Sequence, residues 1–238
     1  MLINIKLHEQ TYKNRLKYLF KPQKGSDALI IVFSAFTGEK RRYNYIKTLK
    51  DIKCNKLFIL DNFGIKGSYY LYENGEDYPK NLVISLIKNI INKIQPKEII
   101  TTGSSKGGTA AIYFGLEIGA TEIYSGACQF NLGSYLHRKD HEDIFKGMMG
   151  GGAGYAEAQV LNSIMPEQIQ KHKDKKPTVY VVYSKKELTY ERQIIDLLKS
   201  LTNANIPTIE KEYDFEDHDE IGVYFGKYMK KQFIKYSK

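Results

Sequence analysis

The sequence predicts an α/β fold with a mostly parallel central sheet. Runs of β-branched and aromatic residues alternate with amphipathic stretches along the chain, which is typical of parallel strands joined by crossover helices. The hydrophobic fraction of 42% and the charged fraction of 26% indicate a globular protein with an ordinary core. At 238 residues, without an internal repeat, the chain suits one domain. We therefore expect a single α/β domain over residues 1–238.

The first half of the chain is expected to form two strands and two helices. Residues 28–36, ALIIVFSAF, are a continuous apolar run that predicts a buried strand. The polar segment 39–52, rich in Arg and Tyr, predicts a helix, and the apolar run at about 56–60 predicts the second strand. Residues 79–94 have apolar positions at helical spacing, with Pro79 placed to open the helix.

Strand and helix continue to alternate in the second half, with one interruption. The segments EIITTG (98–103) and EIYSGAC (122–128) predict strands on either side of a helix in GGTAAIYFGLEIG. Residues 129–176 show no clear strand, so we expect an irregular insertion above the sheet rather than a second domain. The remaining predicted elements are a strand at 178–184, a helix at 191–204, a strand at 208–215 and a last helix from about Glu220.

The segment Gly103-Ser104-Ser105-Lys106-Gly107 lies between a predicted strand and a predicted helix. Ser105 has glycine two residues before and two residues after it, which is the G-x-S-x-G pattern of a nucleophile elbow. A strand that turns into a helix so abruptly strains the turn residue and leaves no room for side chains two positions away. The N–H groups of the following helix favour negative charge at the same point. We therefore predict that Ser105 is a nucleophile and that Gly103 and Gly107 shape its elbow.

Phosphate-binding loops do not fit this segment. A P-loop needs Ser or Thr directly after its lysine, whereas Gly107 and Gly108 follow Lys106. The dinucleotide pattern G-x-G-x-x-G is absent. The segment therefore predicts nucleophilic chemistry rather than nucleotide binding.

Composition excludes several further classes of function. The net charge is +9, but the lysines are scattered and no nucleic-acid module is present, so we expect no nucleic-acid partner. Cys54 and Cys128 lack the spacing of a zinc or redox site, so we predict buried thiols. The chain has no signal-peptide pattern and no apolar run long enough to span a membrane, so we expect a cytoplasmic protein.

His218 is the predicted general base. In folds with this elbow, the partners follow the nucleophile as an acid and then a histidine, each after a later strand. His218 lies between the predicted strand at 208–215 and the last helix. His172 lies in a charged stretch that we expect to be solvated, and His137 and His141 lie in the expected insertion without a third metal ligand. We expect no metal site.

Glu187 is the predicted acid, because it follows the strand at 178–184 most closely. There it would hold the imidazole of the base in its productive tautomer. Glu191 lies one helical turn later, and Asp214 and Asp217 are alternatives close to His218 in the sequence. Such closeness makes a good side-chain geometry harder to reach.

An oxyanion hole needs two backbone N–H groups. One is expected from Lys106, the residue after the nucleophile. The second is expected from the loop after the first buried strand, where SAFTG offers Phe36, with Ala35 as the alternative. Side chains matter little at such positions, so the sequence alone does not decide between the two.

Several segments resemble the XcbB/CpsF family of capsular polysaccharide biosynthesis proteins, and also the hydrolase-like domain of the accessory Sec system acetyltransferase. The resemblance covers most of the chain from about residue 28 and is most specific in GSSKGGTAAIYFGL; VFSAF, LDNFGIKGSYY, SGACQFNLGSYL and DHDEIG add to it. It implies an α/β-hydrolase-like three-layer sandwich, with Ser105 as nucleophile, Glu187 as acid and His218 as base. It also implies O-acyl chemistry on a sugar.

The sequence therefore predicts a serine-dependent esterase or O-acyltransferase that works through an acyl-enzyme. We expect no cofactor. The expected partners are a small-molecule acyl donor or an acylated glycan, and the insertion at 129–176 is expected to control water access to the active site. The alternative is a non-catalytic hydrolase-fold partner in capsule or glycoprotein export machinery. A lipase is less favoured because the insertion lacks an apolar lid.

Overall fold

The computed structural model describes residues 8–38, 40–151 and 153–237. Its centre is an eight-stranded sheet in the order β1-β2-β4-β3-β5-β6-β7-β8. The pairs β1–β2 and β2–β4 are antiparallel, and all other neighbours are parallel, so the predicted mostly parallel sheet is confirmed. The strands are β1 (Gln10–Tyr12), β2 (Leu16–Lys21), β3 (Ala28–Phe33), β4 (Asn55–Ile59), β5 (Glu98–Ser104), β6 (Glu122–Gly126), β7 (Thr178–Tyr183) and β8 (Thr208–Glu212).

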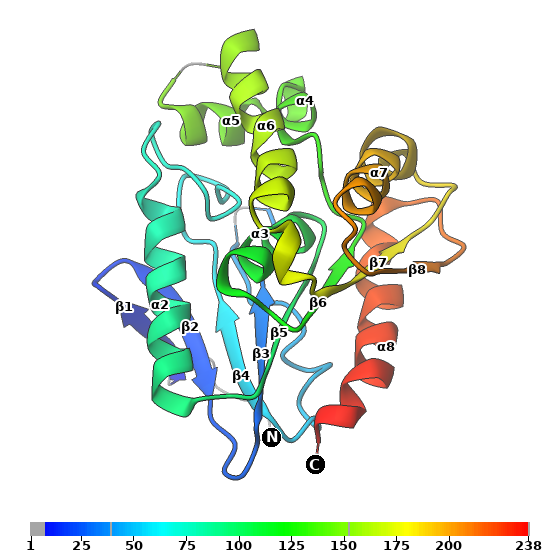
Figure 1. The fold of residues 1–238 in the computed structure, drawn as a ribbon. Helices are drawn as coiled ribbons and strands as arrows, with labels where there is room; N and C mark the ends of the chain where they lie inside the picture. The colour runs from blue at the N-terminus through cyan, green and yellow to red at the C-terminus, as the bar shows by residue number, and fades with distance from the viewer. Residues whose placement is uncertain (1–7, 39, 152, 238) are drawn as a thin grey trace.

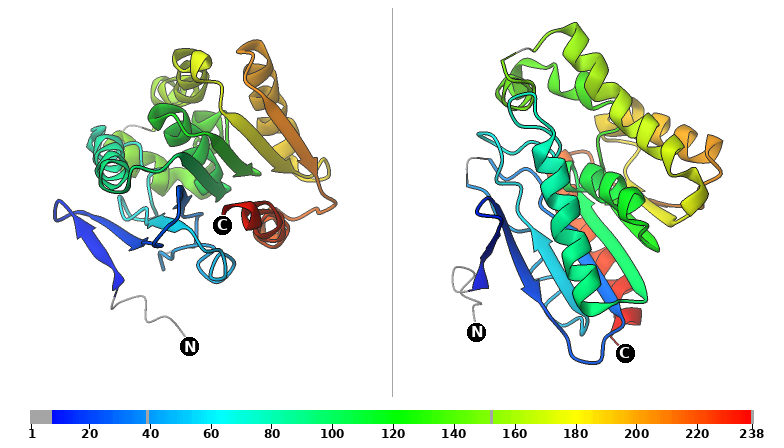
Figure 2. Two further views of the ribbon diagram at one scale, coloured as in Figure 1. Left: turned by 60° about the horizontal axis from the view of Figure 1, so that its bottom comes forward. Right: turned by 60° about the vertical axis from the view of Figure 1, so that its left-hand side comes forward.

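Helical and turn segments cover both faces of the sheet (Figures 1 and 2). One face carries α2, α3, α6 and α7, and the opposite face carries α8 and the turns at 45–51. Every residue of β3 and β4 is buried, as expected for central parallel strands covered on both sides. The helices are α2 (Tyr78–Ile94), α3 (Lys106–Ile118), α4 (Leu132–Leu136), α5 (Glu142–Met149), α6 (Tyr155–Lys171), α7 (Ile195–Asn203) and α8 (Ile221–Phe233).

The described part of the segment 129–176 is mostly helical, so the expectation of irregular structure was wrong. The helices α4 and α5 lie above the carboxyl ends of the strands, and α6 descends from there beside α3 (Figure 1). Helix α6 contains Pro166 in its interior, a residue that interrupts the usual hydrogen bonding of a helix. Tertiary packing stabilises it, because Leu161, Met165 and Ile169 are buried in the core that also contains α3.

The helix expected at 39–52 is absent from the described part of that range, which excludes residue 39. The chain instead forms turns at 45–51, and Tyr45 has a φ of 61°, which a right-handed helix does not allow. Tertiary contacts satisfy the polar groups of this segment. The Lys56 ammonium donates to the carbonyls of Leu49 and Ile52, and the Asn44 side chain accepts from the amide of Ala35.

The β1–β2 hairpin has no counterpart among the predicted elements. Its loop is Lys13-Asn14-Arg15, in which Lys13 and Asn14 have φ values of 46° and 57°, and the Arg15 amide donates to the Tyr12 carbonyl. Such a turn usually contains glycine, so the sequence carries no strong signal for it. No helix among the described residues is long and apolar enough to cross a membrane.

Candidate active site

Ser105 occupies the junction between β5 and α3 and has a strained backbone, with φ 50° and ψ −126°. Its amide donates to the Gly126 carbonyl at 2.7 Å, which anchors the bend to the neighbouring strand. A Cβ atom on Gly103 would lie 2.3 Å from the carbonyl oxygen of Gly107, and one on Gly107 would lie 2.6 Å from that of Phe33. Both distances are far below van der Waals contact. The bend therefore requires glycine at both positions.

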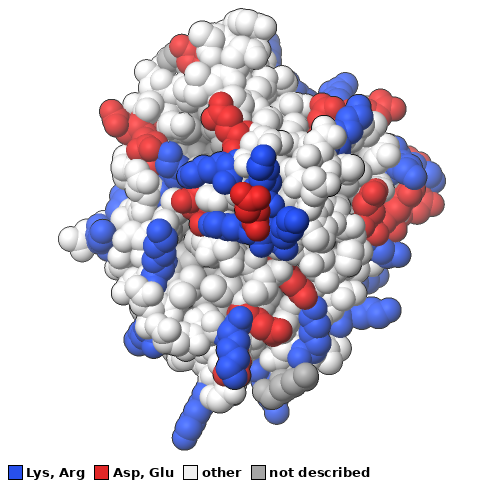
Figure 3. Space-filling view, viewed as in Figure 1, with Lys and Arg blue, Asp and Glu red and all other residues white. Residues whose placement is uncertain are grey.

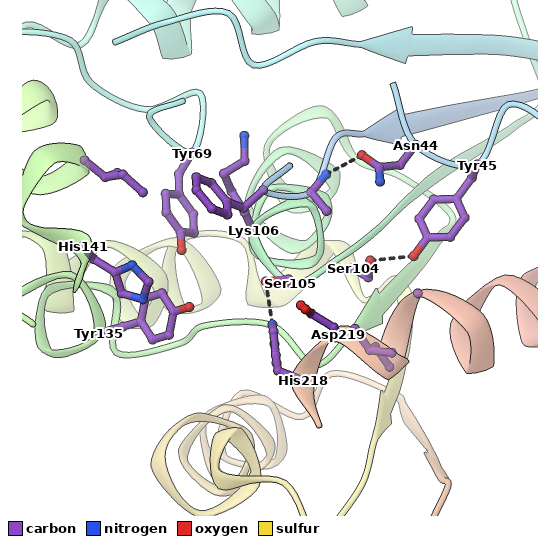
Figure 4. A pocket seen from close by; sticks show the side chains of 15 residues that line it. Asn44, Tyr45, Tyr69, Ser104, Ser105, Lys106, Tyr135, His141, His218 and Asp219 are labelled. Carbon is purple, nitrogen blue, oxygen red and sulfur yellow. Dashed lines mark hydrogen bonds between the residues drawn. The ribbon is translucent and has the colours of Figure 1, made fainter. Parts of the chain in front are cut away.

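The structure brings Ser105, His218 and Glu187 together in one hydrogen-bonded line. The Ser105 Oγ lies 2.8 Å from His218 Nε2 (Figure 4). His218 Nδ1 lies 2.9 Å from Glu187 Oε1. The three side chains follow β5, β8 and β7, whose carboxyl ends share one edge of the sheet. Glu187 is buried, whereas the His218 side chain is 30% exposed toward the pocket. The sequence analysis selected the same three residues, and their roles as nucleophile, base and acid stay a prediction.

The other candidate acids lie in different environments. The Asp214 carboxylate pairs with Lys186 at 2.7 Å. The backbone amide of Asp217 donates to the Glu220 carboxylate. Glu191 is exposed. Within the described part of the chain, the only carboxylate that bonds His218 is that of Glu187.

Thr189 donates hydrogen bonds to the Glu187 carboxylate, a role that the sequence analysis did not predict. Its amide donates to Glu187 Oε1 at 3.2 Å, and its hydroxyl donates to the same oxygen. The hydroxyl also lies 3.3 Å from His218 Nδ1. Both Thr189 and Glu187 are buried. A carboxylate that accepts several such hydrogen bonds keeps a fixed orientation toward the imidazole.

The backbone around the predicted oxyanion hole distinguishes Phe36 from Ala35. The Ala35 amide donates to the Asn44 side chain at 2.9 Å. The amides of Phe36 and Lys106 have no hydrogen-bond partner among the residues that the structure describes. Both residues line the pocket that contains Ser105. This arrangement favours Phe36 over Ala35, and the oxyanion role of the two amides stays a prediction.

A pocket of about 320 Å³ opens above Ser105. Figure 4 shows Ser105 between two groups of side chains: Tyr69, Tyr135 and His141 on one side, and Asn44 and Tyr45 on the other. Helix α4 and the turn after it therefore supply part of the pocket wall.

His141 is one of these wall residues, although the sequence singled it out only as half of a candidate metal pair. Its ring stacks on Tyr135 at a centroid distance of 4.5 Å. Burial lowers the pKa of His141, and the nearby Asp140 carboxylate partly opposes this effect. His137 instead packs on Phe145. In the described residues, no cluster of His, Cys, Asp or Glu has the arrangement of a metal site.

His172 is buried, so the expectation that it is solvated was wrong. Its Nε2 lies 2.8 Å from the Glu117 carboxylate, at the contact between α6 and α3. It does not line the pocket above Ser105. His172 therefore contributes to the packing of α6 on α3.

Gln129 is a second residue that the sequence interpretation missed. It is fully buried, and its Nε2 lies 3.4 Å from Ser105 Oγ. The backbone amide of Gln129 donates to the Thr109 hydroxyl at 2.9 Å, and the Tyr69 hydroxyl donates to the side-chain Oε1 of Gln129 at 3.3 Å. The Ser105 hydroxyl therefore has a neutral side-chain donor on one side and an imidazole on the other.

Comparisons with known proteins identify the fold. No family model and no curated protein sequence matches the chain. Among solved structures, a mutant of the capsule O-acetyltransferase of Neisseria meningitidis serogroup A in complex with CoA aligns with a TM-score of 0.78, 22% identity and 94% coverage of both chains. The fluorophosphonate-binding serine hydrolase F of Staphylococcus aureus aligns with a TM-score of 0.67, 13% identity, and coverage of 97% of this chain and 96% of that chain.

A third neighbour belongs to an assembly. The glycosylation-associated protein complex Gap123 of Streptococcus agalactiae aligns over 94% of this chain but only 46% of the other, with a TM-score of 0.77 and 18% identity. Together with the sheet topology, these similarities establish an α/β-hydrolase-like fold. The resemblance to the XcbB/CpsF family stays a prediction, because no family model matches.

Proposed function

We propose that this protein is a serine-dependent O-acyltransferase or esterase that acts on a sugar or on a capsular or cell-surface glycan. The observation that carries the proposal is the 2.8 Å contact of Ser105 Oγ with His218 Nε2, at a strained elbow that opens into a pocket. The capsule O-acetyltransferase of similar fold supports the choice of a glycan as acyl acceptor. The serine hydrolase of similar fold supports the covalent route.

In the first half of the proposed reaction, His218 Nε2 removes the proton from Ser105 Oγ as this oxygen attacks the acyl carbonyl carbon. The carbonyl π electrons move onto oxygen, and the amides of Lys106 and Phe36 donate hydrogen bonds to the resulting oxyanion. The oxyanion then collapses and expels the alcohol or thiol, which takes the proton from His218. Glu187 holds Nδ1–H and stabilises the transient imidazolium.

In the second half, a sugar hydroxyl or water attacks the acyl-serine. His218 removes the proton of the attacking hydroxyl and returns it to Ser105 Oγ when the ester bond to the serine breaks. Transfer and hydrolysis differ only in which hydroxyl reaches the acyl carbon. We propose that the segment 129–176, as an insertion in a single hydrolase domain, decides between them, since Tyr135, His141 and Ile144 line the pocket.

Labelling with a fluorophosphonate probe tests the proposed nucleophile. We expect labelling and p-nitrophenyl acetate turnover in the wild type, and loss of both in Ser105→Ala and His218→Ala. Ser163→Ala is the matched control, because this hydroxyl lies on α6 and bonds the Val160 carbonyl; it should be labelled like the wild type. Labelling that persists in Ser105→Ala would refute the assigned nucleophile. Acyl transfer from acetyl-CoA to a saccharide then separates transferase from esterase.

A non-catalytic partner in capsule or glycoprotein export machinery is the second candidate. The observation in its favour is the similar fold within the Gap123 complex, where the matching part is 46% of a longer chain. A wild-type protein that is neither labelled by the probe nor active on esters would favour this alternative.

A further inference from the structure

A buried ion pair lies directly behind the elbow. Lys106 Nζ lies 2.6 Å from Asp61 Oδ2, and the two side chains are 4% and 0% exposed. The Ser68 amide donates to the same carboxylate oxygen at 2.8 Å. Gly67, with φ 97°, closes over the pair: a Cβ atom there would lie 2.9 Å from both Asp61 Oδ2 and Lys106 Nζ. The loop after β4 therefore has no space for any side chain at this point.

Stability alone does not explain why charged residues occupy this position. Removing two charges from water is costly, and uncharged replacements of a buried pair are often neutral or stabilising. Burial lowers the pKa of Lys106, and the Asp61 carboxylate opposes this effect. Asp61 Oδ1 is also buried without a hydrogen-bond partner among the described residues. The G-x-S-x-G pattern itself sets no requirement for lysine after the serine.

The ion pair continues into a polar network that reaches the other half of the predicted oxyanion hole. Lys106 Nζ lies 5.0 Å from the centroid of the Tyr70 ring. The Tyr70 hydroxyl accepts hydrogen bonds from the amide and from the hydroxyl of Ser34, both at 2.7 Å, and donates to the Ile59 carbonyl. The Ser34 hydroxyl in turn accepts from the Asp61 amide at 3.2 Å. Ser34 opens the loop that carries Phe36.

We propose that the Asp61–Lys106 pair, through Tyr70 and Ser34, sets the separation and direction of the two oxyanion-hole amides. The pair joins three chain segments: the elbow, the end of β4 and the loop after β3. Asp61, Lys106 through its side chain, and Tyr70 are positioning residues, because they act on the reaction only through the backbone amides of Lys106 and Phe36. This inference rests on the proposed function, since it assigns a supporting network to the same site.

The test removes both charges of the ion pair and keeps side chains of similar size. In Asp61→Asn/Lys106→Met both charges are absent, while the Asn carbonyl keeps an acceptor for the Ser68 amide. We expect each single substitution to lower the melting temperature, because it leaves one buried charge unpaired, and the double variant to recover most of this loss. The kcat for p-nitrophenyl acetate in the double variant should fall about 10- to 100-fold, and KM should change less than about 3-fold.

A second measurement, the affinity of a transition-state analogue, tests the oxyanion hole directly. A trifluoromethyl ketone forms a tetrahedral adduct with the serine, so its affinity reports how well the amides fit the oxyanion. We expect the affinity to fall in the double variant by about the same factor as kcat. A double variant that is as stable as the wild type and keeps the wild-type kcat and inhibitor affinity would overturn the inference.

Tyr70→Phe provides an independent test if the double variant does not fold. It removes the hydroxyl that bonds Ser34 and keeps the ring, so kcat and ketone affinity should both fall. Tyr124→Phe is the matched control, because it removes a buried hydroxyl that bonds Glu122, outside the pocket. Equal kcat in Tyr70→Phe and wild type would also overturn the inference. Failure of the proposed function has a different signature, because the wild type itself would be inactive and unlabelled.

Discussion

Ser105 has a positive φ that L-residues rarely adopt, and it is held there by contacts on both sides of the bend. The same conformation places its hydroxyl toward His218. The backbone strain and the orientation of the Ser105 hydroxyl therefore have one structural cause. A change that relaxes the bend should remove both.

Gly103→Ala tests this link. The new methyl group would overlap the Gly107 carbonyl, where the Cβ distance is 2.3 Å, so we expect a loss of at least about 2 kcal/mol in the free energy of unfolding and loss of probe labelling. Gly147→Ala is the control: it lies in α5 with open space around its Cβ position, and helix propensity predicts unchanged or slightly higher stability. Urea unfolding of both variants measures the difference. Equal stability of the two variants would contradict the account of the elbow.

Glu187→Gln tests the orientation of the base. The amide preserves the shape of the side chain but cannot stabilise the imidazolium in the same way, so kcat should fall about 10²- to 10⁴-fold. Thr189→Val, which removes a hydroxyl donor to Glu187, should give a smaller loss, and Thr189→Ser should retain most of the activity. Steady-state ester hydrolysis measures all three variants. A Glu187→Gln enzyme with wild-type kcat would exclude Glu187 as the acid.

At the residue scale, the sequence predicts contacts between residues that each follow a strand of the parallel sheet. Ser105, Glu187 and His218 each follow a strand, and parallel strands bring such residues to one edge of the sheet. Gln129, Thr189 and Asp61 were missed because their roles depend on contacts through space. In particular, nothing local in the sequence indicates that the Lys106 side chain bonds a carboxylate that follows β4, 45 residues away.

At the scale of elements, α6 shows how tertiary contacts stabilise a segment with weak local signals. Its Gln168 side chain donates to the Tyr113 carbonyl and to the Glu117 carboxylate of α3, and His172 contacts the same carboxylate. The sequence analysis found no clear strand in 129–176 and predicted an irregular insertion there. The Lys13-Asn14-Arg15 loop and the turns at 45–51 were missed for a related reason: neither has a strong local pattern.

Acid titration tests the contact between α3 and α6. Burial raises the pKa of Glu117, but hydrogen bonds from Gln168, His172 and Lys171 outweigh this and lower it to about 2. The unfolded chain therefore binds more protons than the folded one between the ordinary glutamate pKa and about 2, so stability falls as pH falls through this window. Glu117→Gln should lower stability at neutral pH and flatten this dependence. Chemical unfolding at several pH values measures the free energy of unfolding of both proteins. The same pH dependence in Glu117→Gln and in the wild type would contradict this contribution of Glu117.

At the scale of the whole molecule, the alternation of strands and helices predicted the mostly parallel sheet, because parallel strands need crossover connections. Figure 3 shows Lys and Arg in small groups with Asp and Glu among them on the face that it draws, although the net charge is +9. The residues to which we assign the proposed chemistry, Ser105, His218 and Glu187, meet at one edge of the sheet.

The proposed mechanism requires a covalent acyl group on Ser105, which mass spectrometry of the intact and digested protein detects. After brief mixing with p-nitrophenyl acetate or acetyl-CoA, we predict a mass increase of one acetyl group, located on the peptide that contains Ser105 and absent from Ser105→Ala. An acetyl group on another residue, or the same increase in Ser105→Ala, would contradict the account.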